Sequence, residues 1–485
     1  MRSTFGGIEI AKRSLFTQQA ALTTTGHNIS NANTRGYTRQ VVNMVASRPI
    51  EAVGLMRSDI PGQMGQGVEF TSINRIREGF LDRQYYNENK SYGDWSIRKD
   101  TLEKLEAIIN EPSDTGLSQV MNNFWNSWQE LTKQPDNLET RAVVKESALA
   151  LTDAFNSIAT KLNDLNTDLN DNISVKATQV NSTLKQIAAL NVEIFRVEGL
   201  GNDANDLRDQ RDVLLDDLSK IVNITVNEDP TGYTVQMGNA VLVTGQTANE
   251  FNLDTIDTTY PSDLNSGELY ALKLSTTQYV NEYKNQMNSL ASTIIKEVNA
   301  IHSQGYTLKG PEATRGGVFF NPIAEADAGR AAELMNVSST ITEDVENIAA
   351  SKAIFTDAAS GFDKVVRGNN ELALQIAGLK NVKFNFDGSG LQKIILNGGT
   401  FDEFLRAVVG TIGVQTQEAT RQTENQKILV DQVESRRQSV SGVSLDEEMA
   451  NMIKFQHAYN AAARSLTTFD EALDKVINSM GVVGR

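Results

Sequence analysis

The sequence contains no cysteine and only three histidines. Without cysteine, the chain has no disulfide, no thiolate metal site and no cysteine nucleophile. His27, His302 and His457 stand apart, with no HExxH motif and no second histidine at ligand spacing. Each is better explained as a packed or surface side chain than as a metal ligand. We therefore expect no metal and no cofactor.

Other motifs of catalysis are also missing. The chain has no Gly-Lys dipeptide, which excludes a phosphate-binding P-loop, and no GxSxG nucleophile motif. Its densest charge cluster is DLRDQRDVLLDDLSKIV, from Asp206 to Val222. A hydrolase using these carboxylates is one hypothesis. A helix whose first-turn aspartates favour the positive end of the dipole, with pairing to Arg208 and Arg211, explains the run better. We therefore predict that the chain is not an enzyme.

Positive charge is scarce overall. There are 45 Lys and Arg against 61 Asp and Glu, a net charge of −16, so binding to nucleic acid is not expected. No apolar run reaches the roughly 18 residues of a membrane span, so membrane insertion is not expected either. Lys12 and Arg13 interrupt the only candidate for a signal peptide. Export, if it occurs, is then expected without a cleaved leader.

The charge is uneven along the chain. Residues 1–48 carry six bases and one acid, a net +5, whereas residues 444–485 carry four bases and six acids, a net −2. A basic segment on an acidic body is typical of a binding or export element, although chance composition explains so short a segment equally well.

Long segments without helix breakers predict a largely helical body. Residues 117–198 contain no glycine and only one proline, Pro135. Within it, apolar residues recur at alternating spacings of four and three, which is the pattern of a coiled-coil seam. A helix of 44 residues here would span roughly 66 Å. The asparagine-rich stretch 163–172 is where this helix could break. The seam residues are Leu151, Phe155, Ile158, Leu162, Leu165 and Leu169.

Residues 221–275 have a different pattern, which predicts a small β domain. Ile221–Val226 is rich in β-branched residues, Asp229–Gly232 forms a turn, and Gly238-Asn239 suits a tight hairpin. Leu269–Leu274 is predicted as a further strand. A helix is expected over Tyr279–Ile301.

The predicted fold is therefore α+β. We divide it into a terminal coiled-coil domain (1–45 with 444–485), a mainly helical body with some β-hairpins (46–220 with 276–443) and the inserted β domain (221–275). In the body, a hairpin around 382–396 is expected beside a short helix at Glu371–Leu379. Residues 325–365 give no clear pattern.

The two ends of the chain carry the strongest patterns. Ser444 and Glu447 form a capping box at the start of a C-terminal helix. Nine of its eleven seam positions are apolar, over an arc too wide to be left in water. The eleven positions are Leu445, Met449, Met452, Gln456, Tyr459, Ala463, Leu466, Asp470, Leu473, Ile477 and Met480.

The N-terminal segment is weaker. Its apolar residues recur only every seven positions, and Thr23–Thr25 disfavours helix, so it should order only when docked on the C-terminal helix. It should end in a sharp turn, because Asn31, Asn33 and Gly36 tolerate left-handed backbone angles. We predict an assembly interface made of Ile8, Leu15, Leu22, Ile29, Asn31, Asn33, Gly36, Tyr37, Leu445, Met449, Met452, Tyr459, Leu466, Leu473 and Ile477.

These end segments resemble a known family. NISNANTRGYTRQ (Asn28 to Gln40) and LDEEMANMIKFQHAYNAAAR (Leu445 to Arg464) resemble the two terminal signatures of the axial proteins of the bacterial flagellum, which form rod, hook and filament. Within that group, DLRDQRDVLLDDLSKIV and FDEFLRAVVGTIG (Phe401 to Gly413) resemble motifs of the hook-associated protein 1 family.

The resemblance implies a function and a location. Such a protein would be exported by the flagellar type III apparatus and would form a ring that joins hook to filament, with its terminal helices in an inner tube. Its expected partners are further copies of itself, hook protein, a second junction protein on the filament side and an export chaperone. Hook protein or flagellin is the nearest alternative, and a surface-binding role for 221–275 also stays open.

Overall fold

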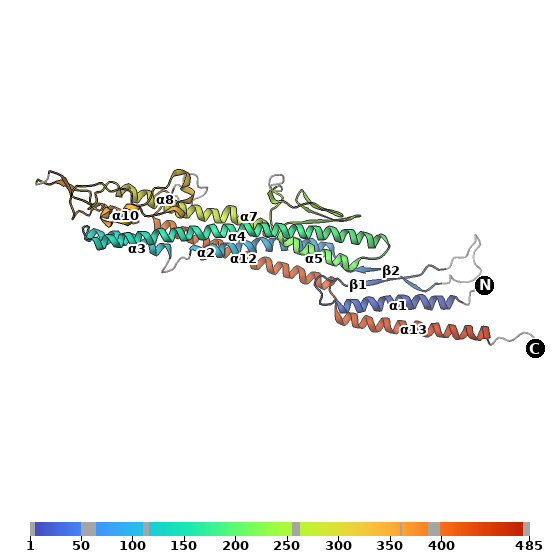
Figure 1. Ribbon diagram of the computed structural model, residues 1–485. Coiled ribbons are helices and arrows are strands. Elements are labelled where there is room, and N and C mark those ends of the chain that lie inside the picture. Colours follow the sequence, from blue (N-terminus) through green and yellow to red (C-terminus); the bar gives the residue numbers. More distant parts are fainter. Residues whose placement is uncertain are drawn as a thin grey trace, which may run out of the picture. The chain divides into compact units, whose positions relative to one another are not determined.

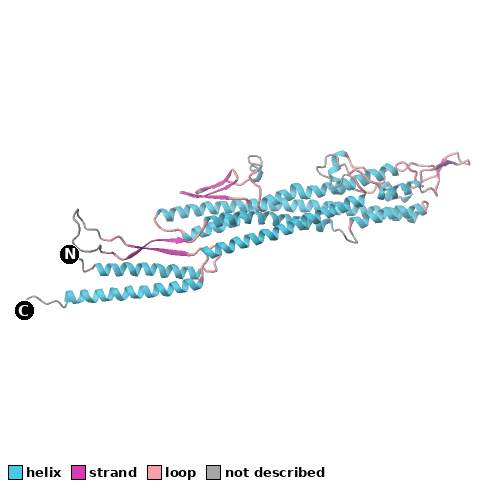
Figure 2. Ribbon diagram, turned by 180° about the vertical axis from the view of Figure 1, so that it is seen from behind, coloured by secondary structure: helices cyan, strands magenta, loops and turns pink. Residues whose placement is uncertain are grey.

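The computed structural model describes residues 5–49, 65–109, 116–254, 262–358, 361–386 and 398–478. The chain divides into two compact units. Unit 1 comprises Met1–Tyr92, Ala177–Gly267 and Gln426–Arg485, and unit 2 comprises Gly93–Lys176 and Glu268–Asn425. Long helices with a few small antiparallel sheets make up both, which confirms the α+β prediction (Figures 1 and 2). The three-part division drawn from the sequence stays a prediction.

Three helices contribute residues to both units: α2 (Gly79–Ile109), α4 (Leu138–Gly199) and α12 (Phe401–Ser441). Helix α4 runs through the asparagine-rich stretch 163–172 without a break. Tertiary packing overrides the low helix propensity there, because Leu165 and Leu169 are buried. None of the helices in the described ranges is long and apolar enough to span a membrane.

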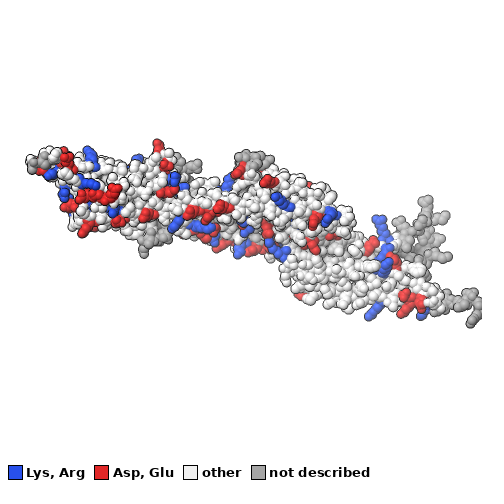
Figure 3. Space-filling view, in the orientation of Figure 1, with Lys and Arg blue, Asp and Glu red and all other residues white. Residues whose placement is uncertain are grey.

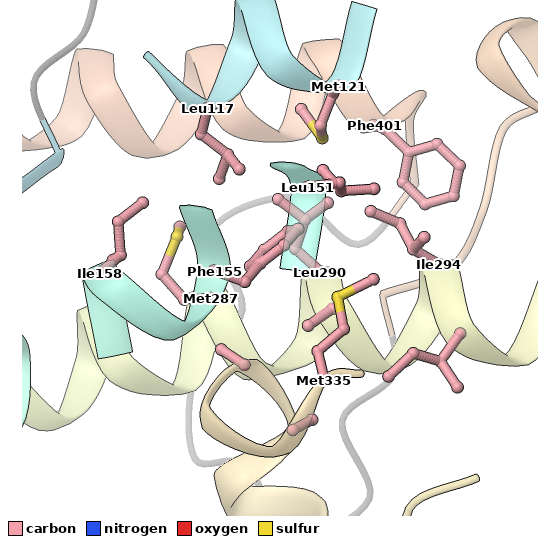
Figure 4. Close-up of a cluster of buried hydrophobic side chains, with 14 of the residues drawn as sticks. Leu117, Met121, Leu151, Phe155, Ile158, Met287, Leu290, Ile294, Met335 and Phe401 are labelled. Atoms are coloured by element: carbon pink, nitrogen blue, oxygen red, sulfur yellow. The ribbon is translucent and has the colours of Figure 1, made fainter. Parts of the chain in front are cut away.

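Unit 2 is built around the predicted seam of α4. All six seam residues from Leu151 to Leu169 are at most 7% exposed. They pack with side chains from α3 (Leu117–Lys133) and α8 (Asn281–His302) in one apolar core, part of which Figure 4 shows. Aromatic rings complete this core, with Trp125 stacked on Phe401 at 5.5 Å. Because other helices of the same chain bury the seam of α4, this helix contributes to the stability of the monomer.

The predicted strand Leu269–Leu274 is wrong: these residues form helix α7 (Glu268–Leu274). It continues through a π-helical segment (Ser275–Val280) into α8, the helix that was predicted. Leu269, Leu272 and Val280 are buried at helical spacings. A six-residue apolar run cannot distinguish strand from helix, and here the spacing to the residues beyond it decided the outcome.

The rest of unit 2 consists of short elements. The predicted helix at Glu371–Leu379 is found as α11 (Glu371–Gly378). The hairpin expected around 382–396 lies partly outside the described residues, and its described part has one antiparallel bridge, between Phe384 and Gly399. The remaining elements are 3-10 turns at Glu325–Arg330, Val345–Asn347 and Leu379–Asn381, helices α9 (Ala331–Leu334) and α10 (Ser339–Glu343), and strands β7 (Ile354–Thr356) and β8 (Asp363–Val365).

Unit 1 contains both ends of the chain. Helix α1 (Gly6–Ser30) leads into the antiparallel hairpin β1 (Gln40–Ala46) and β2 (Val68–Arg75). Helix α5 (Asn205–Ile221) follows α4, and α13 (Leu445–Asn478) follows α12.

Unit 1 also contains a four-stranded antiparallel sheet in the order β3-β4-β5-β6, within the range predicted to hold strands. Gly238-Asn239 joins two of the strands as predicted, with Gly238 at φ +58° and Met237 paired to Ala240. The first strand begins later than predicted, because Ile221 is buried as the last residue of α5. The strands are β3 (Thr225–Asp229), β4 (Gly232–Met237), β5 (Ala240–Thr244) and β6 (Thr247–Ala248).

Candidate assembly interface

The two ends of the chain pair as antiparallel helices. A Cβ added to Gly7 would lie 2.5 Å from the ring of Phe469, and Asn28 at the other end of α1 donates to Glu448 at 3.1 Å. The start of α1 therefore lies against the end of α13, as Figure 1 shows. The β1–β2 hairpin also contacts α1, since Thr17 donates to the carbonyl of Val68 at 3.3 Å. Helix α1 is thus covered from two directions.

The register of α13 against α1 follows from these end contacts. Alternating spacings of four and three connect Glu448 to Phe469, and Phe455 and Ala462 fall on this covered side. The pattern in the sequence favoured a register that leaves Phe455 and Phe469 beside the seam. Because the apolar arc of α13 is wider than one seam, both registers fit the pattern. They share four residues, all half-buried: Met452, Tyr459, Leu466 and Leu473.

Helix α1 contacts α13 mainly through small and polar residues. Ala11, Ala21 and Thr25 are buried, and they lie at coiled-coil spacing between Gly7 and Asn28. Small residues let the helix axes approach closely, which explains why the segment forms a helix despite Thr23–Thr25. The four predicted apolar residues are only half-buried at the edges of this contact: Ile8, Leu15, Leu22 and Ile29.

Much apolar surface on the pair stays uncovered. Along all of α13 only Glu448 and Ala462 are buried. Met449, Ile453 and Ile477 are 51%, 56% and 70% exposed, and Leu445 is also exposed. Figure 3 shows few charged side chains over the neighbouring surface of unit 1. An exposed apolar surface of this kind marks an interaction site.

A buried asparagine joins the two ends to the hairpin. Asn28 Nδ2 donates to the carbonyl of Gln40 at 2.9 Å and to Glu448 Oε2 at 3.1 Å. Its Oδ1 accepts from the hydroxyl of Tyr37 at 2.7 Å and from the backbone of Gln40 at 3.0 Å. Both amide hydrogens and both lone pairs are used, so no other residue type could replace Asn28 without losing bonds. Burial raises the pKa of Tyr37, which keeps its hydroxyl a donor.

Arg39 continues this network. Its Nε donates to Glu448 at 2.8 Å, its Nη1 to Glu447 at 2.7 Å, and its backbone N–H to the carbonyl of Ser441 at 2.8 Å. The predicted capping box is half formed, because Ser444 Oγ accepts from the Glu447 backbone at a long 3.5 Å while the Glu447 carboxylate binds Arg39. We call Asn28, Arg39 and Glu448 the terminal lock.

The acidic run on α5 contacts the turn that follows α1, on the side away from the terminal lock. Thr38 donates from its backbone and its hydroxyl to Asp209, at 2.9 and 2.7 Å. Arg75 binds both Asp209 and Asp212, at 2.6 and 2.9 Å, and Arg77 binds Asp212 at 2.9 Å. Despite these partners, burial raises the pKa of Asp209 above its usual value. The carboxylates are therefore occupied in structural pairs.

The arginines of the same run do not pair as predicted. Arg208 binds Glu198 and Glu228, at 2.6 and 2.8 Å. Arg211 is buried over the ring of Tyr233, 3.4 Å from its centroid. They join α5 to α4 and to the β3–β6 sheet, which the sequence had not indicated because their partners are distant along the chain.

A second charged cluster lies where α12 ends. Asp216 accepts from Arg437 at 3.1 Å, and Arg437 also contacts Asp82 at 3.1 Å. Burial raises the pKa of Asp216 to about 7, although Arg437 and Arg77 oppose the shift. This group therefore changes its charge near neutral pH.

The predicted turn residues have unequal roles. Asn31 caps α1 by donating to the carbonyl of His27 at 3.1 Å, whereas Asn33 is exposed. Gly36 has φ +78°, and a Cβ there would lie 2.0 Å from Val213, so glycine is required. The lock residues Asn28, Arg39 and Glu448 were missed, although both signature segments contain them, because a hydrophobic pattern does not reveal a buried polar contact.

A groove of about 750 Å³ lies between the turn and α4 and α5, lined in part by His27, Tyr37, Leu190, Asp206 and Val213. Across the described ranges, no three His, Asp or Glu side chains are placed to hold a metal ion.

Comparison with known proteins supports the resemblance. The model of the flagellar hook-associated protein FlgK helical domain matches residues 102–320, and that of the flagellar basal body rod FlgEFG protein C-terminal region matches residues 434–480. The chain is 34% identical over 534 residues to flagellar hook-associated protein 1 of Bacillus subtilis, covering 100% of both chains. The chain belongs to the hook-associated protein 1 family.

A second relative and a solved structure support the same assignment. The Salmonella typhimurium protein is 26% identical over 558 residues, covering 97% of this chain and 99% of that protein. The structure of the flagellar hook junction protein FlgK from Burkholderia pseudomallei has a TM-score of 0.60 at 14% identity, covering 75% of this chain and 100% of that one. That structure supports the fold. The predictions of a structural flagellar protein, located in the flagellum, are confirmed by this membership.

Proposed function

We propose that this chain joins the hook to the filament and assembles through the exposed faces of α1 and α13. One observation carries the proposal: α13 is apolar over a wide arc, yet α1 covers only one side of it, with Met449 and Ile453 more than half exposed. A surface of this kind on an exported subunit is expected to be buried in the assembled structure.

The terminal lock supports this role. Arg39 and Glu448 form a pair that is shielded from water, with Glu448 only 2% exposed. Pairs of this kind fix geometry more than they add stability. The lock would hold α1 and α13 at a set position on the start of the β1–β2 hairpin, so that neighbouring subunits meet complementary faces.

The expected partners follow from this proposal. Further copies of the chain would bind laterally, hook protein on one side and a second junction protein on the filament side. An export chaperone would cover the exposed apolar face of α13 before assembly. Among the described residues no observation favours catalysis, since the carboxylates of α5 are engaged by Thr38, Arg75 and Arg77.

A double variant tests the proposal in cells that lack the wild-type chain. Met449→Ser with Ile453→Ser removes apolar surface that the monomer does not use, so the protein should fold and be exported. Cells should then have complete hooks without filaments and should release flagellin into the medium. Phe195→Ser is the matched control, because Phe195 is 51% exposed but lies on α4 and not on a terminal helix.

Two results would contradict the proposal. Normal filaments with the double variant would show that the exposed face of α13 is not an assembly surface. Loss of the hooks themselves in cells without the chain would indicate a hook protein instead.

A further inference from the structure

Unit 1 has a cavity of about 530 Å³ between the end of α4, helix α5 and the turn that joins β3 to β4. We call it the α4–β3 cavity. Its volume is within the roughly 300–1,000 Å³ of small-ligand sites. None of its lining residues belongs to α1 or α13, so it is not part of the assembly interface described above.

A buried guanidinium group with unused donors lines this cavity. Arg211 is 1% exposed, and its Nη1 donates to the side-chain oxygen of Asn191 at 2.8 Å. Its buried Nε and Nη2 have no hydrogen-bond partner in the part of the chain that the structure describes. Leaving donors of a charged group buried and unpaired is costly. An acceptor delivered into the cavity would remove that cost.

Neighbouring groups hold the guanidinium in place. The ring of Tyr233 lies 3.4 Å from its central carbon, and Asn191 donates to the carbonyl of Tyr233 at 3.1 Å. Gly232 has φ +130°, and a Cβ there would lie 2.7 Å from Asn191 Cγ, so only glycine lets the turn approach this closely. A donor group that is ordered in advance costs a ligand little conformational entropy on binding.

The rim of the cavity combines an aromatic ring with charged groups. Phe195 lines the cavity and is 51% exposed. Arg208 binds Glu198 and Glu228 at 2.6 and 2.8 Å, which fixes both carboxylates. Asp229 adds a third carboxylate at the end of β3. An exposed ring beside fixed polar groups can stack on the C–H face of a sugar while the polar groups bind its hydroxyls.

The charges of the lining favour a neutral ligand. Its two arginines and three carboxylates give a net charge of −1, so an anion gains little there, and a cation would meet the buried guanidinium. Carboxylates only accept hydrogen bonds and guanidinium groups only donate them, whereas a hydroxyl does both. A neutral ligand rich in hydroxyls therefore matches this mixed lining better than a peptide does.

We propose that the α4–β3 cavity binds a neutral saccharide, whose ring stacks on Phe195 and whose hydroxyls bond the carboxylates of the rim and Arg211. The unpaired nitrogens of Arg211 are shielded from water, so a ligand oxygen reaches them after a small shift of this side chain towards the cavity. The site gives part of residues 221–275 a surface-binding role. It goes beyond the proposed function and does not depend on it.

Isothermal titration calorimetry with the purified full chain tests the proposal. The neutral probes are the trisaccharides maltotriose, cellotriose, mannotriose and triacetylchitotriose, and the acidic probe is trigalacturonic acid. At least one neutral trisaccharide should bind, and trigalacturonic acid should bind more weakly. The absence of binding by every neutral probe would overturn the proposal, as would tighter binding of the acidic one.

Variants of the full chain locate the binding. Phe195→Ala should weaken the affinity about tenfold, because it removes the stacking surface. Val192→Ala is the matched control: Val192 is 44% exposed on the same helix but does not line the cavity, so the affinity should not change. Equal affinities of the Phe195→Ala variant and the wild type would overturn the proposal.

A substitution at the buried end of the cavity tests the role of the guanidinium. Arg211→Lys keeps the positive charge but replaces the planar set of donors with a single ammonium group, so it should also weaken binding. Circular dichroism checks that each variant is folded. Because Phe195 is exposed, the Phe195→Ala variant still decides the question if Arg211→Lys does not fold. A folded Arg211→Lys variant with unchanged affinity would overturn the assigned role of Arg211.

Discussion

Helices α4 and α13 carry the same kind of pattern but have opposite surroundings. The seam of α4 from Leu151 to Leu169 is buried in the core of unit 2. On α13, by contrast, five apolar side chains stay exposed to water: Leu445, Met449, Ile453, Val476 and Ile477. A heptad pattern thus predicts that a helix will be covered, but not by which chain. We expect α4 to govern the stability of the monomer and α13 to govern assembly.

The largest effect should come from the α4 seam. Phe155→Ala leaves a cavity beside a fully buried ring, and should lower the free energy of unfolding of unit 2 by about 3–5 kcal/mol. All three tryptophans lie in unit 2, so denaturant unfolding followed by tryptophan fluorescence reports this change. Val175→Ala, at a side chain of α4 in the same unit that is 63% exposed, should change the same transition by no more than about 0.5 kcal/mol. Equal losses for both variants would contradict the assignment.

The terminal lock should give the next largest effect. Glu448→Ala removes the buried partner of Arg39 and Asn28, and should destabilise the docking of α13 by about 3 kcal/mol. Glu447→Ala is the matched control, because Glu447 binds the same arginine but its side chain is 62% exposed. It should cost at most about 1 kcal/mol. Hydrogen exchange of the α1 and α13 amides measures both, and similar protection in the two variants would show that the lock is unimportant.

A smaller, pH-dependent effect should come from Asp216. Burial raises its pKa from 3.8 to about 7, so the folded state binds the proton more tightly than the unfolded state. This group therefore stabilises the fold as pH falls from about 7 towards 4, and that contribution is lost as pH rises through 7. Asp216→Asn should flatten the pH dependence of the free energy of unfolding of unit 1 between about pH 4 and 7. An unchanged dependence in hydrogen exchange of α5 would contradict this expectation.

The smallest effect on the monomer should come from α13. Ile453→Ala removes apolar surface that faces water, so the free energy of unfolding should change by less than about 0.5 kcal/mol. Hydrogen exchange of α13 in dilute monomer measures it. A loss of about 2 kcal/mol or more, as for a buried side chain, would show that α13 is already covered in the monomer and would break the comparison with α4.

Much of this architecture could be predicted from local patterns. The long helices, the α4 seam, the Gly238-Asn239 hairpin and the left-handed backbone at Gly36 depend on residues near one another in the chain. The strand at Leu269–Leu274 was predicted wrongly because six residues fit two periods equally well. The contacts of Arg208 and Arg211 were also wrong, since their partners lie on α4, β3 and β4.

The sequence by itself determined the family, the helical periods and the apolar character of both ends, because each is written in the order of neighbouring residues. Only the tertiary structure decided that Phe455 and Phe469 face α1, and that Asn28, Arg39 and Glu448 meet. The tertiary structure also showed that the extent to which each terminal helix is covered does not follow its helix propensity. Helix α1, the weaker helix former, is covered from two directions, whereas α13 is left open. Burial depends on what packs from elsewhere in the chain, and helix propensity does not record it.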